Sequence, residues 1–210
     1  MIINMDMLIE KLEERRKAFV SEADFQLELA WQIKKCYPKA NVRMEYCPLF
    51  DKSMHIDILV TIAGNWIPIE LKYKTKACEK QVKDELYILR NHLAKDVNCY
   101  AYLKDIQRIE KIKKNVPSFA EGYTVFITND LSYTNPPRTP DVNYYAFSIH
   151  EGATKSGTMD WGEKTGDGTK GKEYKDAIVL EGKYEMKWNI YSTLDSTNTG
   201  IFKVLVNKIS

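Results

Sequence analysis

The sequence predicts a mixed α/β fold in which helices flank a central β-sheet. Segments with helical spacing of apolar residues alternate with segments rich in β-branched residues, in the order helix, strand, hairpin, helix, strand. The chain has 210 residues, 44% of them hydrophobic and 29% charged. That length and composition suit one sizeable buried core and argue against wholesale disorder.

Two helices are expected at the start of the chain. Residues 4–18 place Leu8 and Leu12 on one apolar stripe, with charged residues opposite. A second helix is expected over residues 22–36, with Ser21 as its N-cap. It should end before Pro38, because a proline disfavours helical geometry at the preceding residue.

A β-hairpin is the next expected element. A short strand at residues 42–47 precedes two aliphatic runs, residues 55–62 and 66–73, which are separated by Gly64-Asn65. Two such runs around a Gly-Asn pair are typical of a hairpin with a two-residue loop.

The remaining elements follow from periodicity and turn residues. The pattern predicts helices over 79–95 and 101–115, a strand at 123–130, a loop at 135–140, a Gly-rich mobile loop or extended hairpin at 151–173, and two further strands between 177 and 192. We expect residues 1–140 to form a core with its N-terminal helix. Residues 141–210 would form a β-rich C-terminal extension packed on that core.

The hairpin carries the residues of greatest chemical interest. With Gly64-Asn65 as the loop, Asp57 would lie opposite Lys72, and Glu70 would lie opposite a leucine. Alternation along a strand then places Asp57, Glu70 and Lys72 on one face and aliphatic side chains on the other. Two close carboxylates on a buried strand are unfavourable unless they are paired or bind a cation, and Mg²⁺ prefers such hard oxygen ligands.

The Glu-x-Lys triplet alone carries little weight. It recurs three times after residue 170, so only the aliphatic strand context and the acidic partner distinguish Glu70-Leu71-Lys72. A purely structural alternative is a cross-strand salt bridge between Asp57 and Lys72, with Glu70 near an exposed sheet surface.

Over roughly residues 20 to 130, this arrangement resembles the PD-(D/E)XK superfamily of restriction-endonuclease-like nucleases. The resemblance implies a restriction-endonuclease-like core in which Asp57, Glu70 and the backbone carbonyl of Leu71 bind the metal, while Lys72 assists the attacking water. The residue before the aspartate is Ile56 rather than proline, which is a departure at a variable position.

Many such families also have an acidic residue on the helix that precedes the sheet. Glu22 shares a helical stripe with Leu29 and Ile33 and is therefore expected to face the sheet. Glu28 lies on another stripe, which is expected to face solvent. Glu22 is the favoured auxiliary acid, although an acidic residue in a first helical turn can serve the helix dipole alone.

Other polar features have a weaker connection with the site. Gln81 would begin the helix after the Lys72 strand, where some related families have a glutamine. Basic runs on the segments after Lys72 and Lys104 could contact phosphates or simply be solvated. Net charge is only +2, a small surplus for a protein that binds duplex DNA indiscriminately.

The expected function is that of a Mg²⁺-dependent nuclease, with Mn²⁺ as a substitute, that acts on DNA. The charged N-terminus and the lack of a long apolar run predict a cytoplasmic protein without a membrane partner. A homodimer is left open, since a double-strand cut usually needs two sites. The alternatives are a catalytically inactive nuclease-fold module for binding or assembly in a defence or mobile-element system, and a hydrolase of small phosphate esters.

Overall fold

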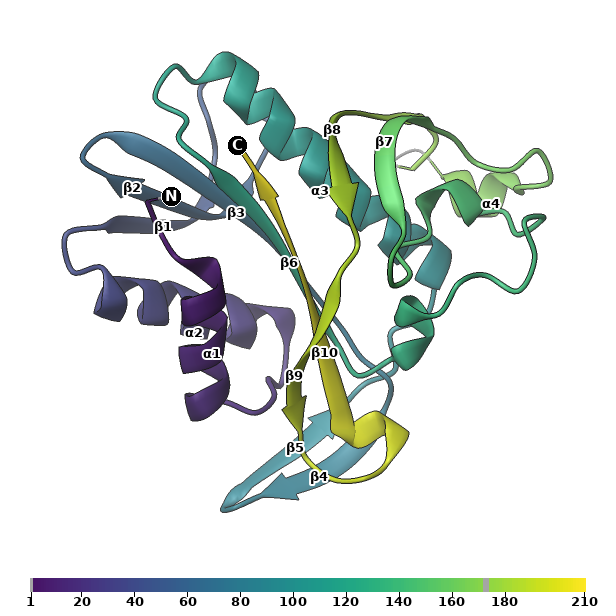
Figure 1. Ribbon diagram of the computed structural model, residues 1–210, viewed down its shortest axis with the longest axis horizontal. Helices are drawn as coiled ribbons and strands as arrows, with labels where there is room; N and C mark the ends of the chain where they lie inside the picture. Colours follow the sequence, from purple (N-terminus) through teal and green to yellow (C-terminus); the bar gives the residue numbers. More distant parts are fainter. Residues whose placement is uncertain (1, 172–173) are drawn as a thin grey trace.

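A six-stranded mixed sheet forms the centre of the molecule, with helices on both of its faces (Figure 1). The computed structural model describes residues 2–171 and 174–210. In spatial order the strands are β1 (Asn41–Tyr46), β2 (Ile56–Ile62), β3 (Asn65–Lys74), β6 (Gly122–Thr128), β10 (Ile201–Ile209) and β9 (Trp188–Thr193). Only β3 and β6 run parallel; the other neighbours are antiparallel. The predicted mixed α/β class, with helices flanking a mixed sheet, is confirmed.

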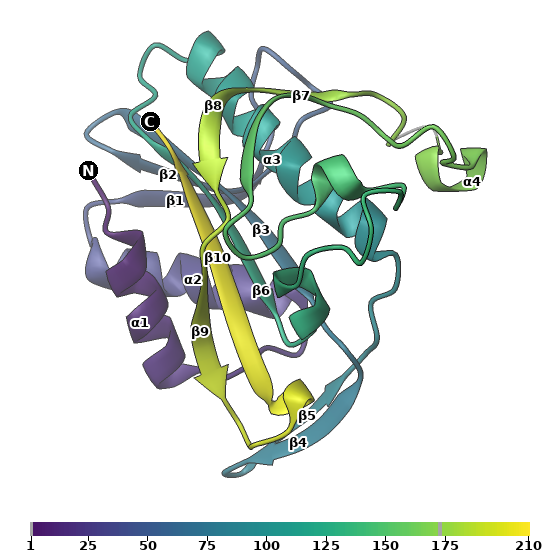
Figure 2. The same ribbon diagram turned by 45° about the vertical axis from the view of Figure 1, so that its right-hand side comes forward.

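The two faces of the sheet bury separate apolar layers. Helices α1 (Met5–Arg15) and α2 (Glu22–Cys36) cover one face, where they pack on Ile67, Ile69 and Leu71 of β3. Helix α3 (Lys95–Asn115) covers the other face (Figures 1 and 2). Successive side chains of a strand point to opposite faces, so Glu70 and Lys72 lie on the α3 side.

The boundaries of the first helices follow the local signals in the sequence. Helix α2 spans the predicted residues, and the side chain of Ser21 accepts a hydrogen bond from the amide of Asp24, which confirms the predicted N-cap. Helix α3 begins at Lys95, six residues before the start that the periodicity of its apolar residues predicts.

The prediction of a helix over residues 79–95 is wrong. This segment forms a hairpin of β4 (Cys78–Val82) and β5 (Glu85–Leu89), which projects beyond the central sheet (Figure 1). Leucines at helical spacing suggested one apolar face, but Leu86 and Leu93 are exposed. The hairpin instead buries Tyr87 and Leu89, two residues apart, against the α1 and α2 layer. Contact with that distant layer therefore overrides the local helical pattern.

The C-terminal third contributes to both the central sheet and a separate layer. Strand β10 lies in the central sheet between β6 and the edge strand β9, whereas β7 (Thr154–Met159) and β8 (Ile178–Glu185) pair with each other beside α3 (Figure 2). The Gly-rich segment between β7 and β8 thus belongs to an extended hairpin and includes the short helix α4 (Asp167–Lys170); residues 172 and 173 lie outside the described part. The described residues also form three 3₁₀ helices: η1 (Leu131–Thr134), η2 (Tyr145–Phe147) and η3 (Asn198–Gly200).

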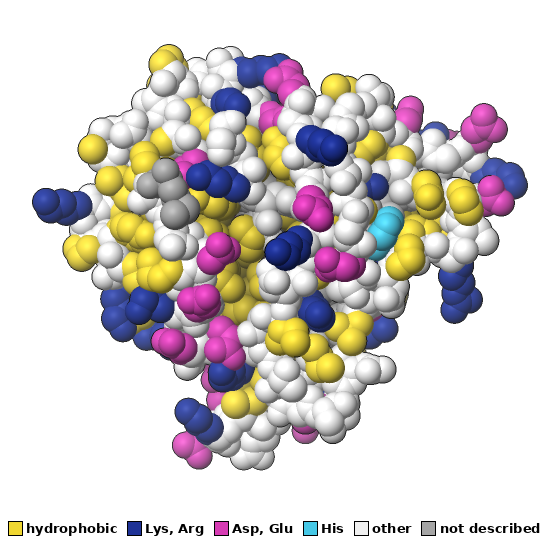
Figure 3. Space-filling model, in the orientation of Figure 1, with side chains coloured by type: hydrophobic (Ala, Val, Ile, Leu, Met, Phe, Trp, Pro, Cys, Tyr) yellow, Lys and Arg dark blue, Asp and Glu magenta, His cyan; other side chains and the backbone are white. Residues whose placement is uncertain are grey.

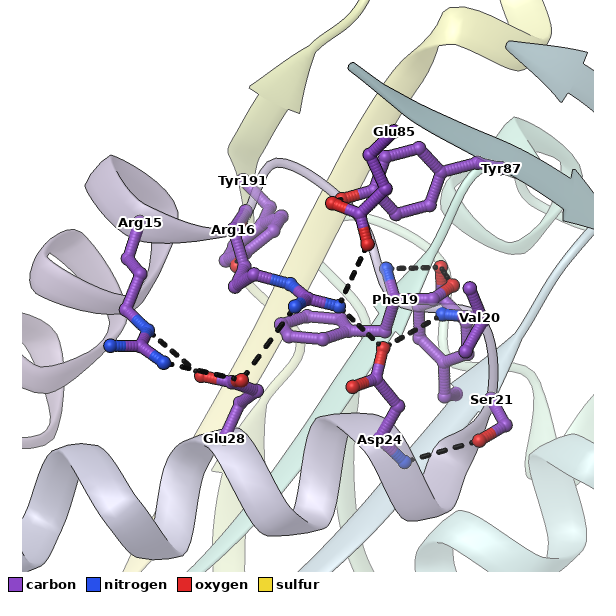
Figure 4. Close-up of polar contacts among 11 residues, drawn as sticks. Arg15, Arg16, Phe19, Val20, Ser21, Asp24, Glu28, Glu85, Tyr87 and Tyr191 are labelled. Atoms are coloured by element: carbon purple, nitrogen blue, oxygen red, sulfur yellow. Dashed lines mark hydrogen bonds and ion pairs between the residues drawn. The ribbon is translucent and has the colours of Figure 1, made fainter. Parts of the chain in front are cut away.

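One arginine connects α1, α2 and the β4–β5 hairpin (Figure 4). The guanidinium of Arg16 lies 2.9 Å from Asp24, 3.7 Å from Glu28 and 3.4 Å from Glu85. Burial lowers the pKa of Arg16, but these surrounding carboxylates outweigh it and raise the pKa overall. Arg16 is therefore a fixed positive charge that holds three elements together.

We expect Arg16→Ala to lower the free energy of unfolding by about 2 kcal/mol, because it leaves partly buried carboxylates without their cation. Arg15→Ala is the matched control: Arg15 also contacts Glu28, but its side chain is 44% exposed. It should cost no more than about 0.5 kcal/mol. Urea denaturation of the two variants measures the difference, and equal losses would contradict the assigned role of Arg16.

On the face of the molecule that Figure 3 shows, acidic and basic side chains are interspersed, and neither sign of charge dominates. This distribution agrees with the net charge of +2. Within the described residues, no helix combines the length and the apolar character required to span a bilayer.

Candidate active site

The β2–β3 hairpin turns one residue earlier than the sequence suggested. Ile62 pairs with Asn65, so Ala63 and Gly64 form the loop, with φ angles of 50° and 82°. Both values are positive, as a type I′ turn requires. The start of β3 is fixed from a distance, because the backbone of Trp66 hydrogen-bonds to Ser118 and Ala120.

The earlier turn moves the cross-strand pairs by two residues. Leu59 lies opposite Pro68 rather than Glu70, so the expected pairs Asp57–Lys72 and Leu59–Glu70 are wrong. A shift of two leaves every side chain on its original face, because strand side chains alternate with a period of two.

Asp57 lies where β2 and β3 separate. The last β2–β3 pair is Ile58 with Ile69, and β3 continues for five further residues. The Asp57 carboxylate accepts a hydrogen bond of 2.6 Å from the amide of Leu71, and its backbone carbonyl accepts one of 2.7 Å from the Gln26 side chain. Burial, together with the nearby carboxylate of Asp105, raises the pKa of Asp57 to about 6 despite the opposing charge of Lys72.

Glu22, rather than Glu28, reaches this part of the sheet. Its carboxylate accepts a hydrogen bond of 2.7 Å from the amide of Tyr73 and lies 3.0 Å from the ammonium of Lys74. Glu28 contacts Arg15 and Arg16 instead. The stripe of α2 that was expected to face solvent therefore forms ion pairs with the end of α1 at this residue. Asp57 and Glu22 thus accept hydrogen bonds from two amides of β3 that lie two residues apart, those of Leu71 and Tyr73.

Glu70 is completely buried, and neither of its carboxylate oxygens has a hydrogen bond within the described part of the chain. The guanidinium of Arg108 lies 3.2 Å away, but its direction does not satisfy hydrogen-bond geometry. Burial and the charges of Asp105 and Asp57 raise the pKa of Glu70 well above its ordinary value. An ionised carboxylate that is buried without a hydrogen bond destabilises the folded protein unless it gains a proton or binds a cation.

Lys72 is held as an ammonium ion. Its Nζ atom lies 2.6 Å from Asp105 and donates a hydrogen bond of 3.1 Å to the carbonyl of Leu71. Burial lowers the pKa of Lys72, but the carboxylates of Asp105 and Asp57 outweigh burial and raise the pKa overall. Lys72 can therefore stabilise negative charge or orient a water, but it cannot accept a proton.

Asp105 and Arg108, one helical turn apart on α3, complete the site. Arg108 lies 3.3 Å from Asp105 and also donates a hydrogen bond to the carbonyl of His55. Sequence reasoning placed Arg108 in a basic run and missed Asp105. A usable signal was present: Asp105 lies on the same helical stripe as Tyr102, Ile106 and Ile109, all of which are buried.

The charges of this cluster do not balance. Asp57, Glu70 and Asp105 contribute three carboxylates against the two cations Lys72 and Arg108, which leaves one negative charge when all are ionised. The donor set of Glu70, Asp57 and the Leu71 carbonyl consists only of hard oxygens, which suits Mg²⁺. In this arrangement, however, no group of three or more His, Cys, Asp or Glu side chains among the described residues is placed to hold a metal ion.

The secondary candidates have partners other than Asp57, Glu70, Lys72, Asp105 and Arg108. Gln81 is exposed on β4 rather than in a first helical turn, and its side chain donates to the carbonyl of Lys83. In the basic run after Lys72, the side chains of Lys74, Lys76 and Lys80 pair with Glu22, Asp130 and Asp195. These three lysines are therefore neutralised within the chain.

Neither a protein-family model, nor a curated protein, nor a solved structure matches this chain.

Proposed function

We propose that this chain is a metal-dependent nuclease with a restriction-endonuclease-like core, and that it hydrolyses phosphodiester bonds of DNA. The observation that carries the proposal is Glu70, a completely buried carboxylate that has no hydrogen bond to any described residue and lies together with Asp57 and the Lys72 ammonium. Perturbed ionisable groups gathered at one place are characteristic of catalytic sites.

The proposed roles follow from the chemistry of each group. Asp57, Glu70 and the Leu71 carbonyl would hold Mg²⁺ or Mn²⁺. The bound metal would polarise a phosphoryl oxygen and acidify water. Lys72 would orient the attacking water and stabilise the negative charge that develops on the phosphate.

Three residues would position these groups. Glu22 holds the amide of Tyr73 and so fixes the end of β3 that carries Lys72. Asp105 sets the position of the Lys72 ammonium. Arg108 provides Glu70 with its nearest cation, at 3.2 Å.

Cleavage assays with plasmid, linear and single-stranded DNA test the proposal, with Mg²⁺ or Mn²⁺ compared against EDTA. We expect metal-dependent products from the wild type and at least about a 100-fold lower rate from Asp57→Asn, because the metal contributes several kcal/mol of transition-state stabilisation. Asp195→Asn is the matched control, an aspartate that pairs with Lys80 far from the cluster. Equal rates for wild type and Asp57→Asn would overturn the assignment.

The second candidate is a catalytically inactive module of the same fold. The 2.6 Å pair between Lys72 and Asp105 favours it, because this pair neutralises the proposed catalytic cation within the chain. Metal-induced stabilisation separates the two candidates. At a concentration 100 times the dissociation constant, a bound ion adds about 2.7 kcal/mol to the free energy of unfolding. No metal-induced stabilisation and no cleavage would favour the inactive module.

A further inference from the structure

A small pocket lies on the β1–β2–β3 part of the sheet, beside the candidate active site. Its volume is about 190 Å³, which is below the range of drug-sized ligand sites and suits one small planar group. The pocket is lined by two aromatic rings, three polar side chains and one leucine: Tyr46, Trp66, Asn41, Arg43, Thr61 and Leu59.

The two rings form a preorganised wall. Tyr46 and Trp66 meet edge to face, with ring centroids 5.3 Å apart and an interplanar angle of 83°. The backbone of Trp66 is held on both sides: its amide donates to the Ser118 carbonyl at 2.7 Å, and its carbonyl accepts from the Ala120 amide at 3.0 Å. Both side chains are only partly buried, so ring surface is accessible to a ligand.

The polar side chains of the pocket have unused capacity for hydrogen bonding. Within residues 2–171 and 174–210, the side chains of Asn41, Arg43 and Thr61 make no hydrogen bond or ion pair. The guanidinium of Arg43 lies 5.8 Å from the centroid of the Tyr46 ring, and none of the described residues that line the pocket is acidic. An arginine free of acidic partners beside aromatic rings is suited to an anion attached to a planar base.

The position of the pocket connects it with the candidate active site. Leu59 is two residues from Asp57 along β2, and Trp66 is four residues from Glu70 along β3. At a rise of about 3.3 Å per residue these separations are about 7 Å and about 13 Å. A single strand whose phosphate lies beside the partly buried Asp57 could therefore place a neighbouring base in the pocket.

We propose that this pocket binds one unpaired nucleobase of a single-stranded nucleic acid, which stacks on Trp66 while an adjacent phosphate pairs with Arg43. Asn41 and Thr61 supply hydrogen bonds to the edge of the base. Stacking on an aromatic ring tolerates any base, so the pocket selects for unpaired strands rather than for a particular sequence. The inference rests on the proposed function, because it assigns the substrate class of the same site.

Fluorescence anisotropy of a labelled oligothymidylate in EDTA tests this inference without cleavage. We expect Trp66→Leu and Arg43→Ala each to weaken binding about tenfold. The matched controls are Trp31→Leu and Arg15→Ala, an exposed tryptophan on α2 and an arginine at the end of α1, whose guanidinium lies 3.9 Å from the centroid of the Trp31 ring. The controls should bind like the wild type. Arg43→Ala guards against misfolding of Trp66→Leu, because Arg43 is exposed and forms no ion pair within the described residues.

Two further arms identify the ligand. For the wild type, an oligonucleotide with abasic residues should bind about tenfold more weakly than the intact strand. For Trp66→Leu, the abasic and intact strands should bind with the same affinity. Thymidine monophosphate alone should bind far more weakly than the strand. Equal affinities of wild type and both pocket variants, or monophosphate binding as tight as the strand, would overturn the inference.

The outcomes for the nuclease and for the pocket are distinguishable. Binding that depends on Trp66 without any metal-dependent cleavage would support the pocket and reject the nuclease. Cleavage that requires Asp57, with strand binding unaffected by Trp66→Leu and Arg43→Ala, would support the nuclease and reject the pocket.

Discussion

Lys72→Ala is expected to abolish metal-dependent cleavage, with a loss of at least about 10²–10³-fold in rate. The ammonium of Lys72 is the one cation that lies both against Asp105 at 2.6 Å and against the Leu71 carbonyl at 3.1 Å within the described cluster. Because its pKa is raised, its charge persists at every pH at which DNA hydrolysis would be assayed. Initial rates with Mg²⁺, for wild type and variant, measure the loss.

The same substitution leaves Asp105 without its closest cation. We expect a loss of about 3–5 kcal/mol in the free energy of unfolding, the usual result when one member of a buried pair is removed. The double variant Lys72→Ala/Asp105→Asn should recover much of this stability and yet remain inactive. Recovery of cleavage in the double variant would assign Lys72 a purely structural role.

Lys80→Ala is the matched control for Lys72→Ala. Lys80 also lies 2.6 Å from an aspartate, Asp195, but its partner is 38% exposed and the pair lies in another part of the molecule. The control should cleave at the wild-type rate. Similar losses of activity in Lys72→Ala and Lys80→Ala would indicate a general effect of lysine removal rather than a role in catalysis.

Glu70→Gln is expected to abolish cleavage while it stabilises the metal-free protein at neutral pH. The folded state raises the pKa of Glu70 well above its ordinary value of 4.5, through burial and the neighbouring carboxylates. The folded protein therefore holds this proton more tightly than the unfolded chain does. Stability from this group is fully present below pH 4.5 and is lost as the pH rises through the higher folded-state pKa.

Asp57 adds to the same trend. Its pKa rises from 3.8 to about 6, so its contribution is also lost as the pH rises from about 4 to about 6. Urea denaturation in EDTA at pH 5 and pH 8 measures the effect. The wild type should lose stability across this interval, and Glu70→Gln should lose less, because a neutral amide replaces the buried acid.

Glu110→Gln is the matched control for Glu70→Gln. Glu110 is also a buried carboxylate, but it accepts hydrogen bonds from the amides of Glu181 and Gly182 and from the hydroxyl of Tyr184. Its replacement should destabilise the protein, by about 1–3 kcal/mol. Mg²⁺ should raise the stability of the wild type and of the Glu110 variant but not that of Glu70→Gln. Destabilisation of metal-free Glu70→Gln at pH 8 would show that the ion contact with Arg108 already compensates the buried charge.

Much of the central hairpin could be predicted from local sequence. The aliphatic alternation of residues 55–62 and 66–73 predicted two paired strands, and the pairing is confirmed. The exact loop could not be predicted, because Gly64-Asn65 is the better turn sequence on local grounds, whereas the observed turn places Ala63 at a positive φ of 50°. Contacts of Trp66 with the segment after α3, more than 50 residues later in the chain, favour the earlier turn.

The error over residues 79–95 has a similar origin. The leucine spacing there agrees with a helix, and nothing local excludes one. The observed hairpin depends on Tyr87 and Leu89 reaching the α1 and α2 layer, and on Glu85 reaching Arg16. These contacts join segments far apart in the chain, so a window of local sequence contains no information about them.

By itself, the sequence determined which side chains share a face of the β2–β3 hairpin, because the alternation of a strand depends only on backbone geometry. Asp57, Glu70 and Lys72 come together for this reason, even though the register differs by two residues from the expected one. Only the tertiary structure decided what surrounds them: the complete burial of Glu70, the pairing of Lys72 with Asp105, and the approach of Arg108. Those features depend on where α3 packs on the sheet, and that packing is the sum of long-range contacts which no local pattern encodes.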